Sequence, residues 1–433
     1  MTEALLQYIW QTRQFNEKDL RTVNNDRLFI IHPGYLNSDA GPDFLHARIR
    51  IGDTLWAGHV ELHMRSGDWH QHKHSDDPAY GNVILHVVFQ HDADIFLPDS
   101  EKALPTLELR PRISSTLLQL YKQFYKYNKD FACQELFHLA DREITGLTKQ
   151  RMAVERLEER SGHAERLLKN LNGDWLHCLY CLVGRYMVGP VNSELMERLL
   201  ASLKPRWLLR MKDDLIQLEA MILGTAGLLD SPEDDYSYHL ASEFALIKRK
   251  YKIKPLEKHL WKYSRMRPDN FIDLRIAQFA LWIYINDSIW AKILSCEKWK
   301  DLKELFKIYM RHYWASHYRL GKKTKRKTKR LGSGSIQLIV INALAPLLFL
   351  YGREHNKEVL QERAMRWLME LPPEDNKIIR QWKGLEMSAE NSFESQGLIH
   401  WRKTYCIPRA CARCPVCHAI LRAGEESARS IPD

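Results

Sequence analysis

The sequence has no uninterrupted apolar run of the length that a membrane helix needs, which is about 20 residues. Its most apolar stretch, residues 335–351, contains Gln337, Asn342 and Pro346, so we expect a buried core helix there. The start of the chain, MTEALLQYIWQTRQF, lacks a basic first segment and a small-residue cleavage site, so no signal peptide is expected. These absences favour a cytoplasmic protein with no membrane partner.

The chain also lacks the cysteine framework of a small secreted protein and any repeat of fixed length. Its 433 residues include eight cysteines, and four of them crowd near the C-terminus. A reducing compartment with one metal site explains this distribution better than disulfides do. The absence of a repeat argues against a regular solenoid. Apolar residues make up 45% of the chain, which excludes a globally disordered protein.

The length and the change of pattern along the chain predict two or three domains. Residues 2–14 have the apolar spacing of a helix. Five segments between Arg27 and Arg110 have the pattern of strands separated by turns: RLFIIH, ARIRIG, TLWAGHVELHM, NVILHVVFQ and TLELR. After Ser114 the periodicity is helical. We therefore predict an α+β protein with three parts: an α/β sheet domain over 1–125, a large all-α domain over 126–400 and a Cys-rich segment over 401–433.

The segment TLWAGHVELHM places a carboxylate and two imidazoles on one face of a predicted strand. Side chains alternate along a strand, so His59, Glu61 and His63 share a face, while Trp56 lies on the opposite, core-like face. Asp43 opens the preceding strand after a Gly-Pro turn, and a hairpin would bring it close to Glu61. Two carboxylates with a neighbouring base can hold Mg²⁺ or Mn²⁺, which generates a hydroxide nucleophile and neutralises a phosphate.

The first helix with Glu3, the GPDF turn and the VELH segment together resemble the PD-(D/E)XK nuclease superfamily. The resemblance implies a core of a helix, three strands, a helix and a further strand. It also implies that Asp43 and Glu61 are the catalytic, metal-binding carboxylates, and that Glu3 is an additional acid from the first helix. His63 stands where lysine is usual, as a base, a metal ligand or the mark of an inactive site. The implied activity is phosphodiester hydrolysis in DNA, in repair or defence.

A second resemblance extends over the whole chain. Four segments carry it: NSDAGPDF, GHVELHMRSGDWHQHKHSDDPAYGNVILHVV, SRMRPDNFIDLRIAQ and TYCIPRACARC. They are similar to the bacterial domain-of-unknown-function family 2851. This resemblance implies a bacterial source but no particular reaction.

The turn DWHQHKHSDDPAY places His70, His72 and His74 at alternate positions. In an extended segment these imidazoles would share one face, and imidazole is a common ligand of transition metals. Proximity to the VELH strand would allow a second metal or a loop that contacts phosphate. Polar, histidine-rich turns are more often solvated surface. Trp69 and Tyr80 are expected to anchor the turn by packing.

A C-x4-C-x2-C-x2-C run near the C-terminus predicts a bound metal, either zinc or an iron–sulfur cluster. Its members are Cys406, Cys411, Cys414 and Cys417. Because the spacing is tight, Cys417 can give way to His418, His400 or a distant cysteine as the fourth ligand. The isolated Cys133 and Cys296 carry no such pattern. Free cytosolic thiols are the alternative.

The segment KKTKRKTKR, residues 322–330, has seven cations in nine positions, and the whole chain has a formal net charge of +10. Such a run can follow a phosphate backbone, so we expect a nucleic-acid partner, with DNA favoured. The expected contacts are Lys322, Lys323, Lys325, Arg326, Lys327, Lys329 and Arg330. A solvated loop between helices has the same composition. Two alternatives to a nuclease therefore stay open: a non-catalytic nucleic-acid-binding protein and a helical interaction protein.

Overall fold

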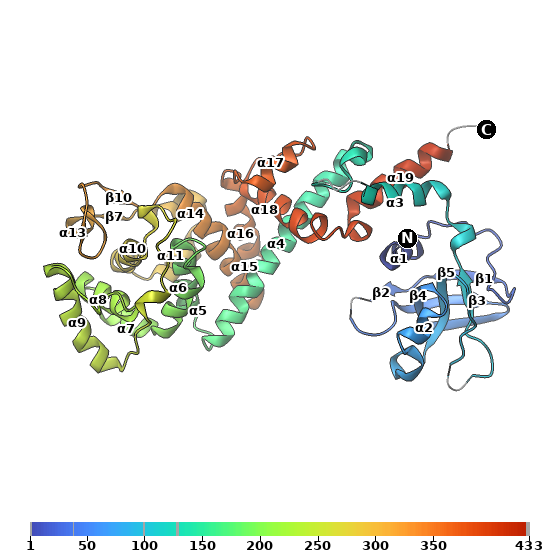
Figure 1. Cartoon of the computed structure of the whole chain (residues 1–433), viewed down its shortest axis with the longest axis horizontal. Coiled ribbons are helices and arrows are strands. Elements are labelled where there is room, and N and C mark those ends of the chain that lie inside the picture. The colour runs from blue at the N-terminus through green and yellow to red at the C-terminus, as the bar shows by residue number, and fades with distance from the viewer. Residues whose placement is uncertain (1, 38, 98–99, 127–129, 430–433) are drawn as a thin grey trace. The chain divides into compact units, whose positions relative to one another are not determined.

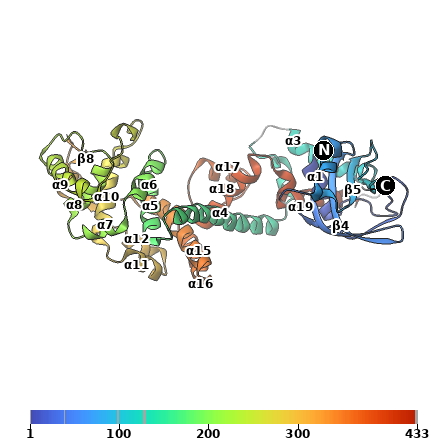
Figure 2. The ribbon, with the colours of Figure 1, turned by 90° about the horizontal axis from the view of Figure 1, so that it is seen from below.

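The protein, seen in a computed structural model, has two compact units (Figures 1 and 2). The structure describes residues 2–37, 39–97, 100–126 and 130–429. The first unit, which we call the sheet unit, comprises residues 1–148 and 401–433, and the second, the helical unit, comprises residues 149–400. The predicted mixture of a strand-rich N-terminal part with a large helical part is confirmed.

The sheet unit is built on a six-stranded mixed sheet. Its strands are β1 (Leu28–His32), β2 (Tyr35–Leu36), β3 (Phe44–Ile51), β4 (Thr54–Arg65), β5 (Val83–Gln90) and β6 (Thr106–Glu108). The order is β1-β3-β4-β5-β6, and β2 pairs with β3. Pairs β1/β3, β2/β3 and β3/β4 are antiparallel, whereas β4/β5 and β5/β6 are parallel. All five predicted strand segments are confirmed.

Helix α1 (Glu3–Thr12) packs against β4, and this packing holds the first turn of the helix beside the sheet. Its buried residues are Leu5, Leu6, Tyr8, Ile9 and Trp10. The Thr2 hydroxyl accepts a hydrogen bond from the backbone N–H of Leu5, which caps the helix at its N-terminus. The Trp10 indole N–H donates to the carbonyl of Pro33. These contacts determine where the Glu3 carboxyl lies.

The parallel pairing of β4 with β5 requires a connection that returns along the sheet. Residues 66–82 make this connection and contain three short helices: α2 (Asp68–Gln71), η1 (His74–Asp76) and η2 (Pro78–Tyr80). Trp69 and Tyr80 are buried in a small cluster with residues of the sheet edge, as expected. The histidine-rich turn therefore contains short helices, and the condition for alternate histidines to share one face, an extended backbone, does not hold.

The C-terminal segment packs with the N-terminal one. Helix α19 (Pro415–Arg429) contacts α3 (Ser115–Lys126), and η9 (Cys411–Arg413) contacts α1. The rings of Tyr8 and His418 stack with centroids 3.9 Å apart. The η8 turn (Arg402–Cys406) contacts η9, and η4 (Gln134–Leu139) contacts α19, whereas η3 (Arg110–Arg112) lies beside β5.

The helical unit has one large apolar core, to which most of its helices contribute. The helices are α4 (Arg142–Asn170, which begins in the sheet unit), α5 (Trp175–Met187), α6 (Ser193–Ser202), α7 (Pro205–Arg210), α8 (Leu215–Thr225), α9 (Asp235–Tyr251), η5 (Lys258–Leu260), η6 (Pro268–Asn270), α10 (Ile272–Ile285), α11 (Ile289–Ser295), α12 (Trp299–Glu304), α13 (His312–Ala315), α14 (Ser333–Ile339), η7 (Val340–Leu344), α15 (Ala345–Glu354), α16 (Glu358–Glu370), α17 (Lys377–Lys383) and α18 (Ser392–Trp401). Short strands β7 (Tyr309–Met310), β8 (His317–Arg319), β9 (Lys322–Lys323) and β10 (Lys329–Arg330) form two small pairs.

The most apolar stretch of the sequence forms the continuous helical run α14–η7–α15. This run, Ser333–Glu354, is long and apolar enough to cross a membrane by length and composition alone. However, 67% of its apolar window is buried inside the protein, as in the core helix that the sequence predicts. Leu344, Leu347 and Leu350 are among its side chains in the core of the helical unit.

Candidate functional site

Strands β3 and β4 bring the Asp43 and Glu61 carboxylates together at one end of their hairpin. The backbone N–H of Asp43 donates to Glu61 Oε2 at 2.9 Å. Asp43 Oδ2 accepts from the backbone N–H of Leu62 at 3.0 Å, and Oδ1 accepts from the Gln7 amide of α1 at 2.8 Å. The expected approach of the two carboxylates is confirmed, and both are held by defined hydrogen bonds.

The electrostatics of this pair disfavour two free negative charges. Burial raises the pKa of Glu61, and the negative charge of Asp43 raises it further. Burial also raises the pKa of Asp43, to which the nearby Glu3 carboxylate adds. The pKa of Glu3 is itself raised by burial. Among the described residues, no lysine or arginine forms an ion pair with any of the three, so the acidic group lacks a protein cation.

Histidines from β4, β5 and the folded connection form a cluster that approaches Glu61 through His63 and His74. His63 Nδ1 lies 2.9 Å from His86 Nε2, and His63 Nε2 lies 3.1 Å from His72 Nδ1. His74 Nε2 lies 3.3 Å from Glu61 Oε1, and His63 Nε2 lies 3.7 Å from that oxygen. One ring nitrogen from each of His63, His72 and His74 falls within a 4.8 Å span. This spacing suits three ligands of one metal ion.

Burial favours the neutral form of His63, His74 and His86, and a histidine must be neutral to bind a metal. Burial lowers the pKa of His63 to about 2 and that of His86 to about 3. Burial likewise lowers the pKa of His74. The buried atoms His74 Nε2 and His86 Nδ1 have no hydrogen-bond partner. A cation held by His74 would satisfy the first of these orphaned nitrogens and offset the charge of Glu61.

Aromatic side chains of the connection hold the histidines in place. The Tyr80 ring stacks on His74 with centroids 3.8 Å apart, and Trp69 packs edge-on against the same imidazole. The Trp69 indole donates to the Ser75 hydroxyl at 3.0 Å. Because Trp69 is fully buried, the imidazole of His74 is fixed beside Glu61 rather than free in solvent.

The structure thus joins all four residues for which the sequence predicts catalysis, and extends the group. Glu3, Asp43, Glu61 and His63 lie together, and His72, His74 and His86 join them. His70 is exposed and stands outside the cluster. Sequence reasoning missed His86, which interrupts the apolar strand NVILHVVF. A histidine in a strand buried on both faces was the available signal.

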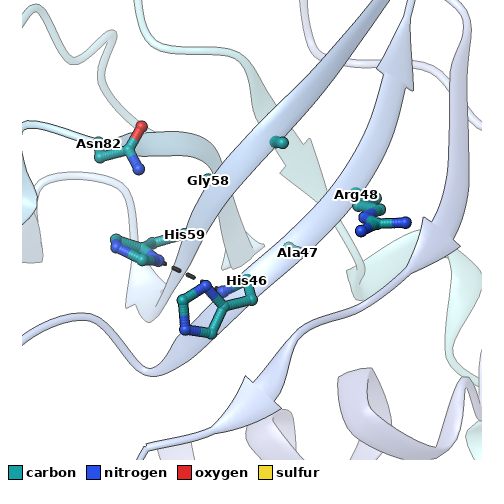
Figure 3. Close-up of a pocket in the computed structure, with 7 residues that line it drawn as sticks. His46, Ala47, Arg48, Gly58, His59 and Asn82 are labelled. Atoms are coloured by element: carbon teal, nitrogen blue, oxygen red, sulfur yellow. Dashed lines mark hydrogen bonds between the residues drawn. The ribbon is translucent and has the colours of Figure 1, made fainter.

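The predicted division of β4 into a core-like face and a polar face does not hold in the first half of the strand. Trp56, expected on the core face, is 45% exposed, because β5 pairs with β4 only from His59 onward and leaves the earlier residues uncovered. His59 faces a different feature, a pocket of about 210 Å³ beside a bulge in β3. Figure 3 shows His59 next to His46, whose backbone N–H donates to His59 Nδ1 at 3.4 Å. His46 adopts φ +58° at this bulge.

The C-terminal cysteines form a buried thiol cluster that includes a cysteine from far away in the sequence. The Cys417 thiol interacts with the thiols of Cys133, Cys411 and Cys414. The hydrogen bond with Cys417 lowers the pKa of Cys414 to about 7. Cys406 lies near the same group, and burial raises its pKa. Cys133, in which the sequence showed no pattern, is therefore part of the cluster.

The two histidines considered as alternatives to Cys417 have other partners. His418 Nε2 lies 2.6 Å from the carbonyl oxygen of Ala412, and its ring stacks on Tyr8. His400 lies in the helical unit, where its ring nitrogens approach Glu155 and Glu159 at 3.4 Å. Of the alternatives, a distant cysteine is the one that the fold brings to Cys417.

The basic run of residues 322–330 begins and ends in the short strands β9 and β10, and residues 324–328 between them form a loop. Its cations are not equivalent. Lys329 is 2% exposed, and its ammonium group donates to the carbonyls of Trp314 and Ala315, each at 2.8 Å. Lys322 forms an ion pair with Glu233 at 2.7 Å. Lys329 therefore belongs to the packing of the helical unit. The other cations of the run are exposed: Lys322, Lys323, Lys325, Arg326, Lys327 and Arg330.

We expect Lys329→Met to destabilise the protein by about 2 kcal/mol, because the carbonyls of Trp314 and Ala315 would each lose the hydrogen bond from the buried ammonium group. The matched change Lys327→Met, at an exposed position of the same run, is expected to leave the melting temperature unchanged. Thermal unfolding of the two variants beside the native protein measures the difference. Equal stability of Lys329→Met and the native protein would show that Lys329 has no structural role.

Comparison with known proteins gives one family. A family model described as "Protein of unknown function (DUF2851)" matches residues 3–377. No curated protein and no solved structure matches the chain. The matched range contains the acidic and histidine cluster and the basic run, and it ends before Cys406. The expectation that the family resemblance reaches the last cysteines is therefore not met by this match.

Proposed function

The chain belongs to the family described as protein of unknown function (DUF2851), a description that names no reaction, so we propose a function from the site. We propose that the sheet unit is a metal-dependent phosphodiesterase that acts on nucleic acid, with DNA favoured. One observation carries this proposal: buried carboxylates and neutral imidazoles converge where no lysine or arginine among the described residues pairs with the acids. In this proposal the protein is bacterial and cytoplasmic and serves repair or defence.

The donor set favours Mn²⁺ over Mg²⁺. Mg²⁺ prefers an oxygen shell, whereas imidazole nitrogens suit transition metals. His63, His72 and His74 supply nitrogens, and Glu61 Oε1 lies within 3.7 Å of the first and 3.3 Å of the third. Asp43 would bind the same ion or a second one through the oxygens that now accept hydrogen bonds.

A bound metal would supply a hydroxide nucleophile near neutral pH and neutralise charge on a phosphate. The protein side chains would position the reactants. Asp43, fixed by Gln7 and the backbone of Leu62, would orient a water molecule or accept its proton. His86 contacts His63 at 2.9 Å and so sets the orientation of that imidazole. Glu3 from α1 would be an additional acid.

In this proposal the sheet unit is PD-(D/E)XK-like, with His63 in the place of the usual lysine. The order of an acid on the first helix, Asp43 at the start of one strand and Glu61 in the next supports that assignment. The exposed cations of the basic run would hold the phosphate backbone, with binding that weakens as salt rises. Lys329 is left out of this group because its ammonium is buried.

We also propose that the thiol cluster holds a structural metal, either zinc or an iron–sulfur cluster. A buried Cys417 thiol that interacts with three other thiols suits soft-metal ligation. The Trp401 indole N–H donates to Cys414 Sγ at 3.4 Å, a contact of the kind that stabilises a thiolate ligand. Cys406 would be an alternative fourth ligand or an outer neighbour.

The test is cleavage of labelled single-stranded and double-stranded DNA, and of RNA, with Mg²⁺ or Mn²⁺. We expect cutting with Mn²⁺ that falls at least ~100-fold in Asp43→Asn and in His74→Ala, because each removes a ligand or a water-positioning group. His70→Ala is the matched control, since His70 is an exposed histidine of the same connection outside the cluster.

Three results would contradict the proposal in different ways. Equal cutting by all variants would indicate a contaminant or another site. Nucleic-acid binding without cutting would favour a non-catalytic protein that keeps this scaffold. A native protein that neither binds nor cuts nucleic acid would favour a helical interaction protein.

A further inference from the structure

The helical unit contains a cavity of about 560 Å³ with a buried carboxyl group at its base. The cavity is lined by residues of α8, α10, β7 and α13. Glu219 is 1% exposed, and its Oε2 accepts hydrogen bonds from the Tyr236 hydroxyl at 2.8 Å and the Trp314 indole at 2.9 Å. The other oxygen, Oε1, is buried and has no partner. A buried acceptor without a hydrogen bond lowers the stability of the fold unless a ligand donates to it.

Flat aromatic rings form the walls of this cavity. The rings of Tyr236 and Tyr313 stack with centroids 4.1 Å apart. The Tyr313 hydroxyl donates to Asp234 at 2.7 Å, which fixes its ring. Tyr284 and Tyr309 are 40% and 45% exposed where they line the cavity. The Tyr313 ring is covered on both faces, by Tyr236 and by His317. The exposed rings of Tyr284 and Tyr309 suit a planar heterocycle, which gains stacking energy on an aromatic face.

Cations lie along one side of the aromatic cavity. The cations Lys307 and Arg311 line it and are exposed, as is the neighbouring His312. A second pocket, of about 490 Å³, shares the wall from residues 309 to 312 and adds Arg326 and Lys327 of the basic run. The aromatic cavity and the cationic pocket are therefore neighbours, with a common wall.

We propose that the aromatic cavity binds one base of a single nucleic-acid strand and that the cationic pocket binds the adjoining phosphate. An exocyclic amino group of the base would donate to the Glu219 carboxylate, and Arg311, Arg326 and Lys327 would contact the phosphate. An aliphatic amine would be repelled by the cations at the cavity. A wholly apolar ligand would leave Glu219 Oε1 without a donor. A nucleotide matches the unpaired carboxyl oxygen, the aromatic rings and the cations together.

The carboxylate also predicts which bases bind. Cytosine, adenine and guanine carry an amino group, whereas thymine flanks its one ring N–H with two carbonyl oxygens that repel a carboxylate. Cytosine and thymine are a matched pair, since both are pyrimidines of similar size. The cavity is therefore expected to prefer strands whose bases carry an exocyclic amino group. This inference concerns binding by the helical unit and does not rest on the proposed cleavage.

The experiment measures binding of fluorescently labelled dC and dT hexamers to the full-length protein by anisotropy, in EDTA, so that metal-dependent cutting cannot contribute. We expect the native protein to bind the dC hexamer at least ~10-fold more tightly than the dT hexamer, the discrimination of one good base contact. Glu219→Gln would present an amide N–H and is expected to abolish or reverse this preference. Arg311→Ala is expected to weaken both hexamers equally, as loss of a phosphate contact does.

The controls separate a lost contact from a lost fold. Lys357→Ala removes an exposed cation outside both pockets and is expected to change neither affinity. Burial raises the pKa of Glu219 to about 7, so the neutral amide of Glu219→Gln should not lower the melting temperature. Equal affinity for the two hexamers, no binding of either, or a dC preference that survives in Glu219→Gln would each overturn the proposal.

Discussion

Glu61→Gln is expected to stabilise the metal-free protein above about pH 7 and to abolish the stabilisation that Mn²⁺ gives the native protein. The pKa of Glu61 is raised in the folded protein by burial and by Asp43, above an unfolded value near 4.5. Folding therefore disfavours its ionised form. The penalty is absent below pH 4.5, grows as the pH rises, and reaches about 2–3 kcal/mol at neutral pH. Glutamine carries no such penalty and can still accept the bond from Asp43 N–H.

Thermal unfolding of the native protein and Glu61→Gln at pH 5 and pH 8, with EDTA or Mn²⁺, measures both effects. At pH 5 with EDTA the two proteins should have nearly equal melting temperatures, which makes the low-pH pair an internal control. At pH 8 with EDTA the variant should be the more stable protein. With Mn²⁺ the order should reverse, because a ligand that binds only the folded state stabilises it.

Two outcomes would refute this account of the cluster. A variant less stable than the native protein at both pH values would mean that Glu61 serves mainly as a structural hydrogen-bond acceptor. An unchanged melting temperature of the native protein with Mn²⁺, and with Zn²⁺ as a second probe, would mean that the cluster binds no such ion.

Cys133→Ser is expected to remove the metal from the thiol cluster, although Cys133 lies more than 270 residues before its partners in the sequence. Binding of a structural metal is coupled to folding, so loss of one thiolate should cost several kcal/mol and lower the melting temperature by about 10 °C or more. Cys296→Ser, at a cysteine of the helical unit that is equally separate in the sequence, should retain the metal.

Metal content and visible absorption of the purified proteins give the readout. About one equivalent of zinc without colour would identify a zinc site, and iron with visible absorption would identify a cluster. Cys406→Ser tests whether that residue is the alternative ligand. Native protein without bound metal, prepared anaerobically, would leave the cysteines as free thiols and contradict the metal proposal.

Local pattern was enough to predict the strands and the acidic pair. Alternation of side chains identified β4 and placed Glu61 and His63 on one face, because the period of a strand is a property of its own backbone. The Gly-Pro turn before Asp43 located the start of β3, and antiparallel neighbours joined by a short turn pair by default. The helical period after residue 114 likewise gave the class of the second unit.

Contacts between distant segments could not be predicted in this way. The parallel pairing of β4 with β5 folds the connection back, so that His74 approaches Glu61 and His72 approaches His63, while His70 is exposed. The same kind of contact brings Cys133 to Cys417 and places Glu219 beneath Trp314.

The sequence by itself determined the five main strands, the helical character after residue 114, the α+β class and the chemical types available for a metal site, because these depend on neighbours along the chain. Only the tertiary structure decided which of those groups meet. It added His86 and Cys133, buried Lys329 and left one oxygen of Glu219 without a partner. The physical reason is that ligation, burial and pKa shifts depend on distances through space, which sequence spacing does not fix.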